Sequence, residues 1–218
     1  MSLTVFDHFE VGPLACNCYI VGDATTNEAI VIDPGGDAEV LATALRDKNL
    51  RVTAIVATHA HFDHLIAAES LRSLTGAPFY MHDADRPLLD WYGESGRMFL
   101  GLDLGPPPEV DTAAGEGDTL AAGAVELRVI HTPGHSPGSI TLTAPGTIFS
   151  GDTLFAGSIG RSDLPGGDTR TLLGAIKEKL FSFDDDARVY PGHGPSTTIG
   201  EEKASNPFVG EAGGLWTP

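Results

Sequence analysis

Short apolar runs separated by turn residues dominate the first third of the chain. Segments 4–6, 18–21, 28–33 and 51–58 have the length and composition of strands, and the last is apolar enough to be buried. Between the last two, one helical face over residues 37–50 is predicted to carry Val40, Leu41, Ala44 and Leu45. A second helix is predicted to follow the strand at residues 51–58 and to end at Gly76.

The strand pattern resumes in the second half of the chain. Segments 124–132, 139–144, 146–152 and 187–194 are expected to form strands. The amphipathic segment 169–183 predicts a helix that Asp168 or Thr169 could cap, and a short helix is expected near residues 199–207. The Gly- and Pro-rich residues 93–117 are interpreted as a surface excursion.

Strands followed by helices therefore occur twice along the chain. This order predicts two similar halves, each a sheet with helices on one face. Packed sheet to sheet, the halves would form an α/β fold, a four-layer αββα sandwich. We expect residues 1–218 to form a single domain.

Composition narrows the choice of partners. With 13 basic against 30 acidic side chains, the net charge is −17 and no basic stripe is present, which argues against nucleic acid and anionic membranes. No apolar run reaches the ~20 residues of a membrane helix. The N-terminus lacks a secretory signal, and Cys16 and Cys18, too close for an unstrained disulfide, indicate reduced thiols on one strand face. A cytoplasmic location is predicted.

Four turns carry an unusual set of nitrogen and oxygen donors, each directly after an apolar strand. They are THAHFDH (58–64), PGHS (133–136), SGDT (150–153) and PGHG (191–194). Alternation directs His59 and His61 to one side, while Asp63 and His64 point elsewhere. One motif can therefore serve two neighbouring centres.

The donors divide into two metal sites. His59, His61 and His135 form one three-ligand set, and Asp63, His64 and His193 form the other. Asp152 can bridge the two as a bidentate carboxylate. Imidazole and carboxylate donors suit zinc, with iron or manganese as alternatives. Two such ions with two carboxylates and one hydroxide carry a net charge of about +1, which would attract an anionic substrate.

THAHFDH followed by GHS, GDT and GHG resembles the metallo-β-lactamase superfamily, whose fold is the αββα sandwich. The motifs GDTLFAGSIGRSDLPGGD and YPGHGPSTTIGEE are most similar to single-domain relatives of glyoxalase II, the hydroxyacylglutathione hydrolases. The resemblance implies the seven-ligand set, two divalent metal ions, and hydrolysis of S-lactoylglutathione-like thioesters. Asp63, His64 and Asp152 would be the catalytic residues.

Thioester chemistry suits the residues present. A hydroxide that bridges two metal ions can attack the carbonyl, and a thiol with a pKa of about 8.5 leaves without a strong general acid. Asp33 is a candidate to orient a ligand histidine, or simply part of an Asp-Pro turn. Arg161 could bind a substrate carboxylate or form a surface ion pair. Met98 and Phe99 could form an apolar lip over the pocket, or merely cover the core.

Two other functions are compatible with this donor pattern. A persulfide dioxygenase would use one iron held by His59, His135 and Asp152, which leaves Asp63, His64 and His193 without a ligand role. A non-catalytic metal-binding module would explain the ligands but not a cleft with open coordination positions. The metal identity, acyl group, thiol carrier and oligomeric state remain open.

Overall fold

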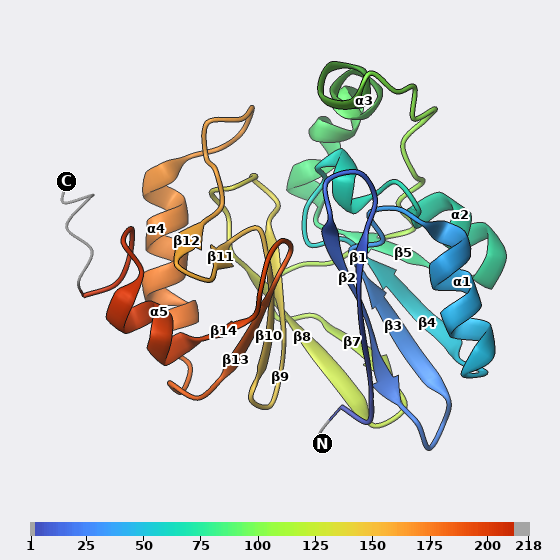
Figure 1. Ribbon diagram of the computed structural model, residues 1–218, viewed down its shortest axis with the longest axis horizontal. Helices are drawn as coiled ribbons and strands as arrows, with labels where there is room; N and C mark the ends of the chain where they lie inside the picture. The colour runs from blue at the N-terminus through green and yellow to red at the C-terminus, as the bar shows by residue number, and fades with distance from the viewer. Residues whose placement is uncertain (1–2, 212–218) are drawn as a thin grey trace.

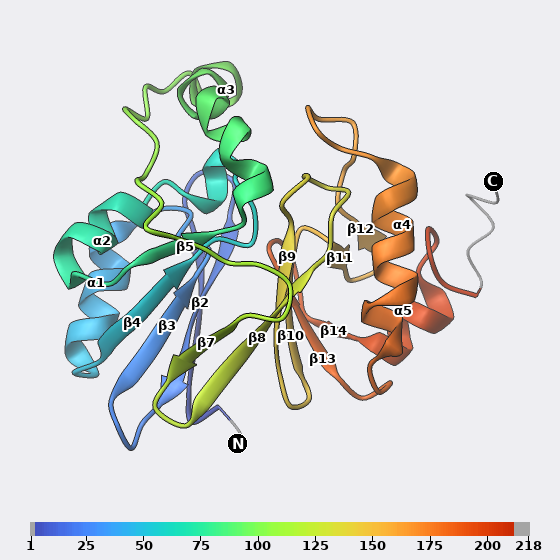
Figure 2. The same ribbon diagram turned by 180° about the vertical axis from the view of Figure 1, so that it is seen from behind.

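Two six-stranded sheets face each other, and helices cover the outer face of each (Figures 1 and 2). The computed structural model describes residues 3–211. This arrangement confirms the predicted four-layer αββα sandwich.

In the first sheet, the spatial order of the strands is their order in the chain. It comprises β1 (Val5–Val11), β2 (Cys16–Asp23), β3 (Glu28–Ile32), β4 (Arg51–Val56), β5 (Phe79–Met81) and β6 (Thr112–Ala113). The first three strands pair antiparallel, whereas β3 to β6 run parallel. Parallel neighbours need a long crossover, and α1 (Ala38–Asp47) and α2 (Ala68–Thr75) supply two of them.

The second sheet has the order β14-β13-β10-β9-β8-β7. Its strands are β7 (Thr119–Ala122), β8 (Val125–His131), β9 (Ile140–Ala144), β10 (Thr147–Gly151), β13 (Arg188–Pro191) and β14 (Thr197–Thr198). Helices α4 (Thr169–Glu178) and α5 (Ile199–Ser205) lie on its outer side (Figure 1). A separate hairpin consists of β11 (Leu154–Phe155) and β12 (Ser158–Ile159).

Three apolar clusters fill the spaces between the four layers. Because side chains alternate along a strand, β3 directs Val31 toward α1 and α2, and Ile30 into the space between the sheets. In β10, Phe149 faces the space between the sheets and Ile148 packs with Leu172 of α4. Each sheet is therefore apolar on both faces.

Several local predictions are confirmed. Gly76, with φ 68°, ends α2 in the left-handed conformation that glycine favours. Asp168, one of two candidates, caps α4 by accepting a hydrogen bond from the Thr171 amide at 2.7 Å. Among residues 3–211, no helix combines the length and apolar composition needed to cross a bilayer.

Other local predictions are wrong in detail. Val40 is 53% exposed, and α1 instead buries Leu41, Ala42 and Leu45. The segment 93–117 contains most of an unpredicted helix, α3 (Tyr92–Leu100). The 3₁₀ segment η2 (Asp83–Trp91) precedes it, where the sequence predicts a short helix over residues 83–92. Gly93 and Gly96 weaken the helical signal of α3, but Gly96 leaves room for the side chain of Leu104.

Candidate metal centre

The four donor turns meet at one edge of the sandwich. They follow the C-terminal ends of β4, β8, β10 and β13. Strands β10 and β13 are parallel neighbours, so the turns that follow them emerge at the same edge of the sheet. Contacts between the halves hold this edge together, because the Ile140 amide donates to the Thr58 carbonyl at 2.8 Å. Gly151, with φ +50°, lies so close to Thr58 that a Cβ there would fall 2.3 Å from its hydroxyl oxygen.

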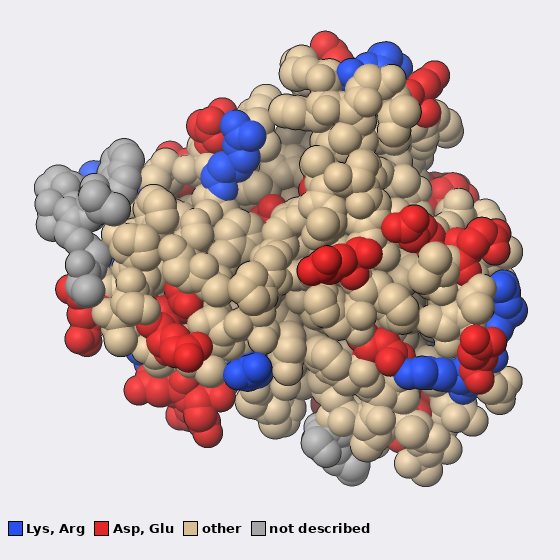
Figure 3. All heavy atoms as spheres, in the orientation of Figure 1, with Lys and Arg blue, Asp and Glu red and all other residues tan. Residues whose placement is uncertain are grey.

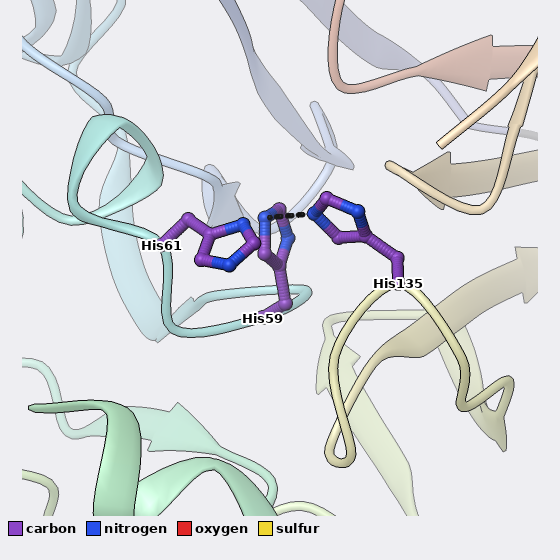
Figure 4. Close-up of side chains that lie close together, drawn as sticks. All are labelled: His59, His61 and His135. Atoms are coloured by element: carbon purple, nitrogen blue, oxygen red, sulfur yellow. Dashed lines mark hydrogen bonds between the residues drawn. The ribbon is translucent and has the colours of Figure 1, made fainter. Parts of the chain in front are cut away.

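His59, His61 and His135 converge on one point. Their imidazoles point toward one another although they come from two distant turns (Figure 4). One nitrogen of each ring lies within 4.8 Å of the others, a spacing that one metal ion can bridge. The Nε2 atoms of His59 and His135 are 3.1 Å apart.

Asp63, His64 and His193 converge in the same way. Asp63 Oδ2 lies 3.2 Å from His193 Nε2, and the Nε2 atoms of His64 and His193 are 3.3 Å apart. The structure thus brings together both predicted three-ligand sets.

Asp152 lies between the two groups. One carboxylate oxygen is 3.5 Å from His64 Nε2, and the other is 3.6 Å from His135 Nε2. The first of these, Oδ1, is buried and has no hydrogen-bond partner among the described residues. A buried carboxylate oxygen without a partner is costly, so this atom indicates a cation as its partner.

The protonation of the group His59, His61 and His135 also suits a cation, whereas acidic neighbours raise the pKa of His64 and His193 despite their burial. Burial, together with the neighbouring imidazoles, lowers the pKa of His61 to about 3. Burial lowers the pKa of His135 to about 4. Neutral rings have lone pairs available, and metal ligation requires that form. The facing Nε2 atoms share at most one proton per pair, whereas an ion would use both lone pairs.

Three of the clustered histidines have a polar partner at their other ring nitrogen, and for His59 Nδ1 it is the Thr58 hydroxyl at 3.1 Å. His135 Nδ1 lies 2.7 Å from the backbone carbonyl of Arg161, a contact that places the proton on Nδ1 and leaves Nε2 free. Asp33 Oδ2 lies 3.1 Å from His64 Nδ1. The same carboxylate accepts from the Thr58 amide and hydroxyl at 2.6 and 2.8 Å. Asp33 therefore has the contacts expected of an orienting carboxylate.

Comparison with known proteins places this centre in a family. The model of the metallo-beta-lactamase superfamily matches residues 11–193. The chain belongs to the metallo-beta-lactamase superfamily. Membership confirms the family that the four donor turns indicated and implies divalent metal ions at the His/Asp cluster.

Individual relatives within the superfamily cover nearly the whole chain. The hydroxyacylglutathione hydrolase GloC of Haemophilus influenzae is 37% identical over 202 residues, covering 88% of this chain and 92% of that protein. BLEG-1 B3 metallo-beta-lactamase superposes with a TM-score of 0.86 at 39% identity, covering 94% and 99% of the two chains. The structure of TTHA1623 in a di-iron-bound form superposes with a TM-score of 0.85 at 39% identity, covering 93% of this chain and 99% of that chain.

Cys16 lies closer to the candidate metal centre than the sequence suggested. Its Sγ is 3.5 Å from His64 Nδ1, on the side of the ring away from the other ligands. Burial raises the pKa of this thiol to about 12, so it stays protonated. Cys16 and Cys18 are both free and buried in the same core cluster, as predicted for a reduced structural pair.

The sequence did not single out Asp85, which joins two of the metal-binding turns. Its fully buried carboxylate accepts from the Ala60 amide at 2.9 Å, between His59 and His61. It also accepts from the Ser136 hydroxyl at 2.7 Å and the Gly138 amide at 2.5 Å. Only the fold brings these donors to one carboxylate, since 51 residues separate Asp85 from Ser136.

Asn17 fixes the fourth turn in a similar way, and the sequence did not indicate it either. Its side-chain amide donates to the carbonyls of Pro191 and Gly194 at 2.9 and 2.8 Å, on either side of His193. Its backbone amide donates to Gly192 at 2.7 Å. Asn17 on strand β2 of the first sheet thus positions the candidate ligand His193, which follows strand β13 of the second sheet.

A cavity of ≈380 Å³ opens onto the ligands His61, Asp63, His135, Asp152 and His193. Figure 3 shows the surface hollowed between α3 and the segment that precedes α4. Met98, Phe99 and Arg161 all line this cavity, where the sequence placed its candidate substrate contacts. The guanidinium of Arg161, however, is paired with Asp163. Binding of a substrate carboxylate there stays a prediction.

The first prediction concerns Gly192. A Cβ at this residue would lie 2.2 Å from Asp152 Oδ1 and 2.7 Å from His64 Cε1. We expect Gly192→Ala to displace Asp152 and to lower the metal content, measured by plasma mass spectrometry, by about half or more. Gly174→Ala in α4 is the control, since nothing lies within 4 Å of its Cβ. Unchanged metal in Gly192→Ala would contradict the proposed crowding.

The second prediction concerns Asp85. Asp85→Ala leaves the buried amides of Ala60 and Gly138 without an acceptor and removes one of the two partners of the Ser136 hydroxyl. We expect the free energy of unfolding in urea to fall by about 3 kcal/mol or more. Asp83→Ala serves as the control, because its exposed carboxylate only pairs with Arg86 and should matter by less than about 1 kcal/mol. Equal losses in both variants would rule out the bridging contribution of Asp85.

Proposed function

We propose that this protein is a dinuclear metal-dependent thioesterase of the glyoxalase II type. The observation that carries the proposal is the pair of three-donor groups on either side of Asp152, at the base of an open cavity. Similarity to the hydroxyacylglutathione hydrolase GloC supports the same reaction class.

In this proposal His59, His61 and His135 would hold one ion, Asp63, His64 and His193 would hold the second, and Asp152 would be a ligand available to both. Two bound divalent ions would supply an activated water and polarise the carbonyl. Zinc suits this donor set best, with iron or manganese as alternatives. Asp63, His64 and Asp152 would be catalytic residues as ligands of these ions.

The lining of the cavity favours thioesters over substrates with poorer leaving groups. Apart from the proposed ligands, Arg161 is the one ionisable side chain among the described lining residues. A guanidinium keeps its proton at neutral pH and is a poor general acid. A thiolate, with its conjugate acid near pKa 8.5, needs no such acid, whereas an amine or alkoxide does.

The two alternatives explain less of the structure. A mononuclear iron dioxygenase would use His59, His135 and Asp152, and would leave the convergent group of Asp63, His64 and His193 without a ligand role. A non-catalytic metal module would not need a cavity that reaches the ligands. A small-molecule substrate, rather than nucleic acid or a membrane surface, agrees with the net charge of −17.

The proposal predicts about two metal ions per chain and hydrolysis of thioesters at neutral pH. The metal content of protein purified without chelator should be measured together with release of free thiol from S-lactoylglutathione and S-hexanoyl-N-acetylcysteamine. Removal of metal with a chelator should abolish thiol release, and zinc should restore it. One iron per chain, with oxygen consumption on glutathione persulfide and no thioester hydrolysis, would contradict the proposal.

A further inference from the structure

The cavity above the ligands has mostly apolar walls. Three separate segments supply them: the turn between β1 and β2, the η2–α3 region, and the loop before α4. The apolar side chains are Leu14, Leu88, Trp91, Met98, Phe99 and Leu164. In Figure 3, the surface around the hollow carries few acidic or basic residues, although the protein has 43 of them.

These side chains are exposed to a degree that calls for a binding partner. Trp91, Met98 and Phe99 are 49%, 65% and 51% exposed, among the largest values for apolar residues in the described part of the chain. Isolated exposed apolar residues are common, but a contiguous group around a cavity marks a binding surface. The rings of Phe99 and Phe62 are stacked with their centroids 6.1 Å apart. The apolar wall therefore continues to Phe62, the residue beside Asp63.

Positive charge for a polyanionic substrate is scarce at this cavity. Arg161 is the one cationic side chain among its described lining residues. The Nε and Nη2 atoms of Arg161 donate to both oxygens of Asp163 at 2.8 and 2.9 Å. This bidentate pair offsets the charge and occupies the geometry that a substrate carboxylate would use. The cavity therefore offers little to the two carboxylates of glutathione.

We propose that the substrate is a thioester with a bulky apolar acyl group, which binds against the wall formed by Trp91, Met98 and Phe99. The inference rests on the proposed thioesterase function and narrows its substrate class. Cellular thiol carriers are polar, so the apolar part of a thioester is its acyl chain, and the carrier can extend into solvent. Water cleaves the acyl–sulfur bond, and the products are an apolar carboxylic acid and the free thiol.

Acyl preference is tested on thioesters that share one leaving group. The metal-loaded protein is assayed with S-acetyl-, S-lactoyl-, S-hexanoyl- and S-phenylacetyl-N-acetylcysteamine, and with S-lactoylglutathione. We expect kcat/KM for the hexanoyl and phenylacetyl esters to exceed that for the acetyl ester by about tenfold or more. Equal values, or faster lactoyl than hexanoyl hydrolysis, would overturn the inference while leaving the thioesterase function intact.

A matched pair of variants localises the effect. Phe99→Asp places a carboxylate in the apolar wall, and we expect kcat/KM for the hexanoyl ester to fall by about tenfold more than kcat/KM for the acetyl ester. Val40→Asp on α1 is the control, since Val40 is 53% exposed and lies outside the cavity. Equal losses on both esters in Phe99→Asp would place Phe99 outside acyl recognition and overturn the inference.

Binding without turnover separates the two proposals. The chain has two tryptophans, Trp91 and Trp216, so a Trp216→Phe background leaves Trp91 as the reporter. Titration with a ketone analogue, in which CH₂ replaces the thioester sulfur, should change Trp91 fluorescence at lower concentration for the hexanoyl than for the acetyl form. That result without hydrolysis of any thioester would support the apolar site and reject the thioesterase function.

A second copy of the chain is the competing occupant of the apolar wall. Sedimentation of the unmodified protein and of Phe99→Asp distinguishes the two cases. A dimer that Phe99→Asp dissociates, combined with no acyl preference, would assign the wall to self-association and overturn the inference. An oligomeric state that is the same in both proteins, together with the acyl preference, supports it.

Discussion

The concentration of donor atoms around Asp152 is the constraint on which the rest of the structure depends. Five histidines and two carboxylates gather at the base of the cavity, and one buried oxygen of Asp152 has no hydrogen-bond partner among the described residues. Without a cation, this arrangement would pair lone pair with lone pair and leave a buried carboxylate oxygen uncompensated. Divalent ions remove that cost, so the centre and its metal stabilise each other.

The scaffold brings the ligands together by joining the two halves at the same edge. No single element holds the centre, because its turns come from both sheets. Asp85 ties the turn after β4 to the turn after β8, and Asn17 on β2 holds the turn after β13. Asp33 orients the turn after β4 from within the first sheet. Through Asp85 and Asn17, the positions of the ligands depend on correct packing of both halves.

Charge and apolar surface are distributed in a way that favours small substrates with an apolar portion. The outside of the molecule carries the large acidic excess, whereas the cavity walls are mostly apolar. Arg161, the one lysine or arginine among the described lining residues, is paired with an aspartate. An acyl chain would find contact area beside the metal centre, and a polar carrier would remain in solvent. The helix α3, which sequence analysis did not anticipate, supplies much of this wall.

The sequence by itself determined the layers and indicated the candidate ligands that the fold brings together. Strand alternation separates Ile30 from Val31 without reference to any partner, and donors placed directly after apolar strands must emerge at strand ends. Tertiary structure decided what depends on residues distant in the chain: the bridging contacts of Asp85, the clamp formed by Asn17, the exposure of Val40 and the apolar wall on α3. A periodic pattern reports which face of an element is apolar. It does not report which neighbour a buried carboxylate meets, because that depends on how the two halves pack.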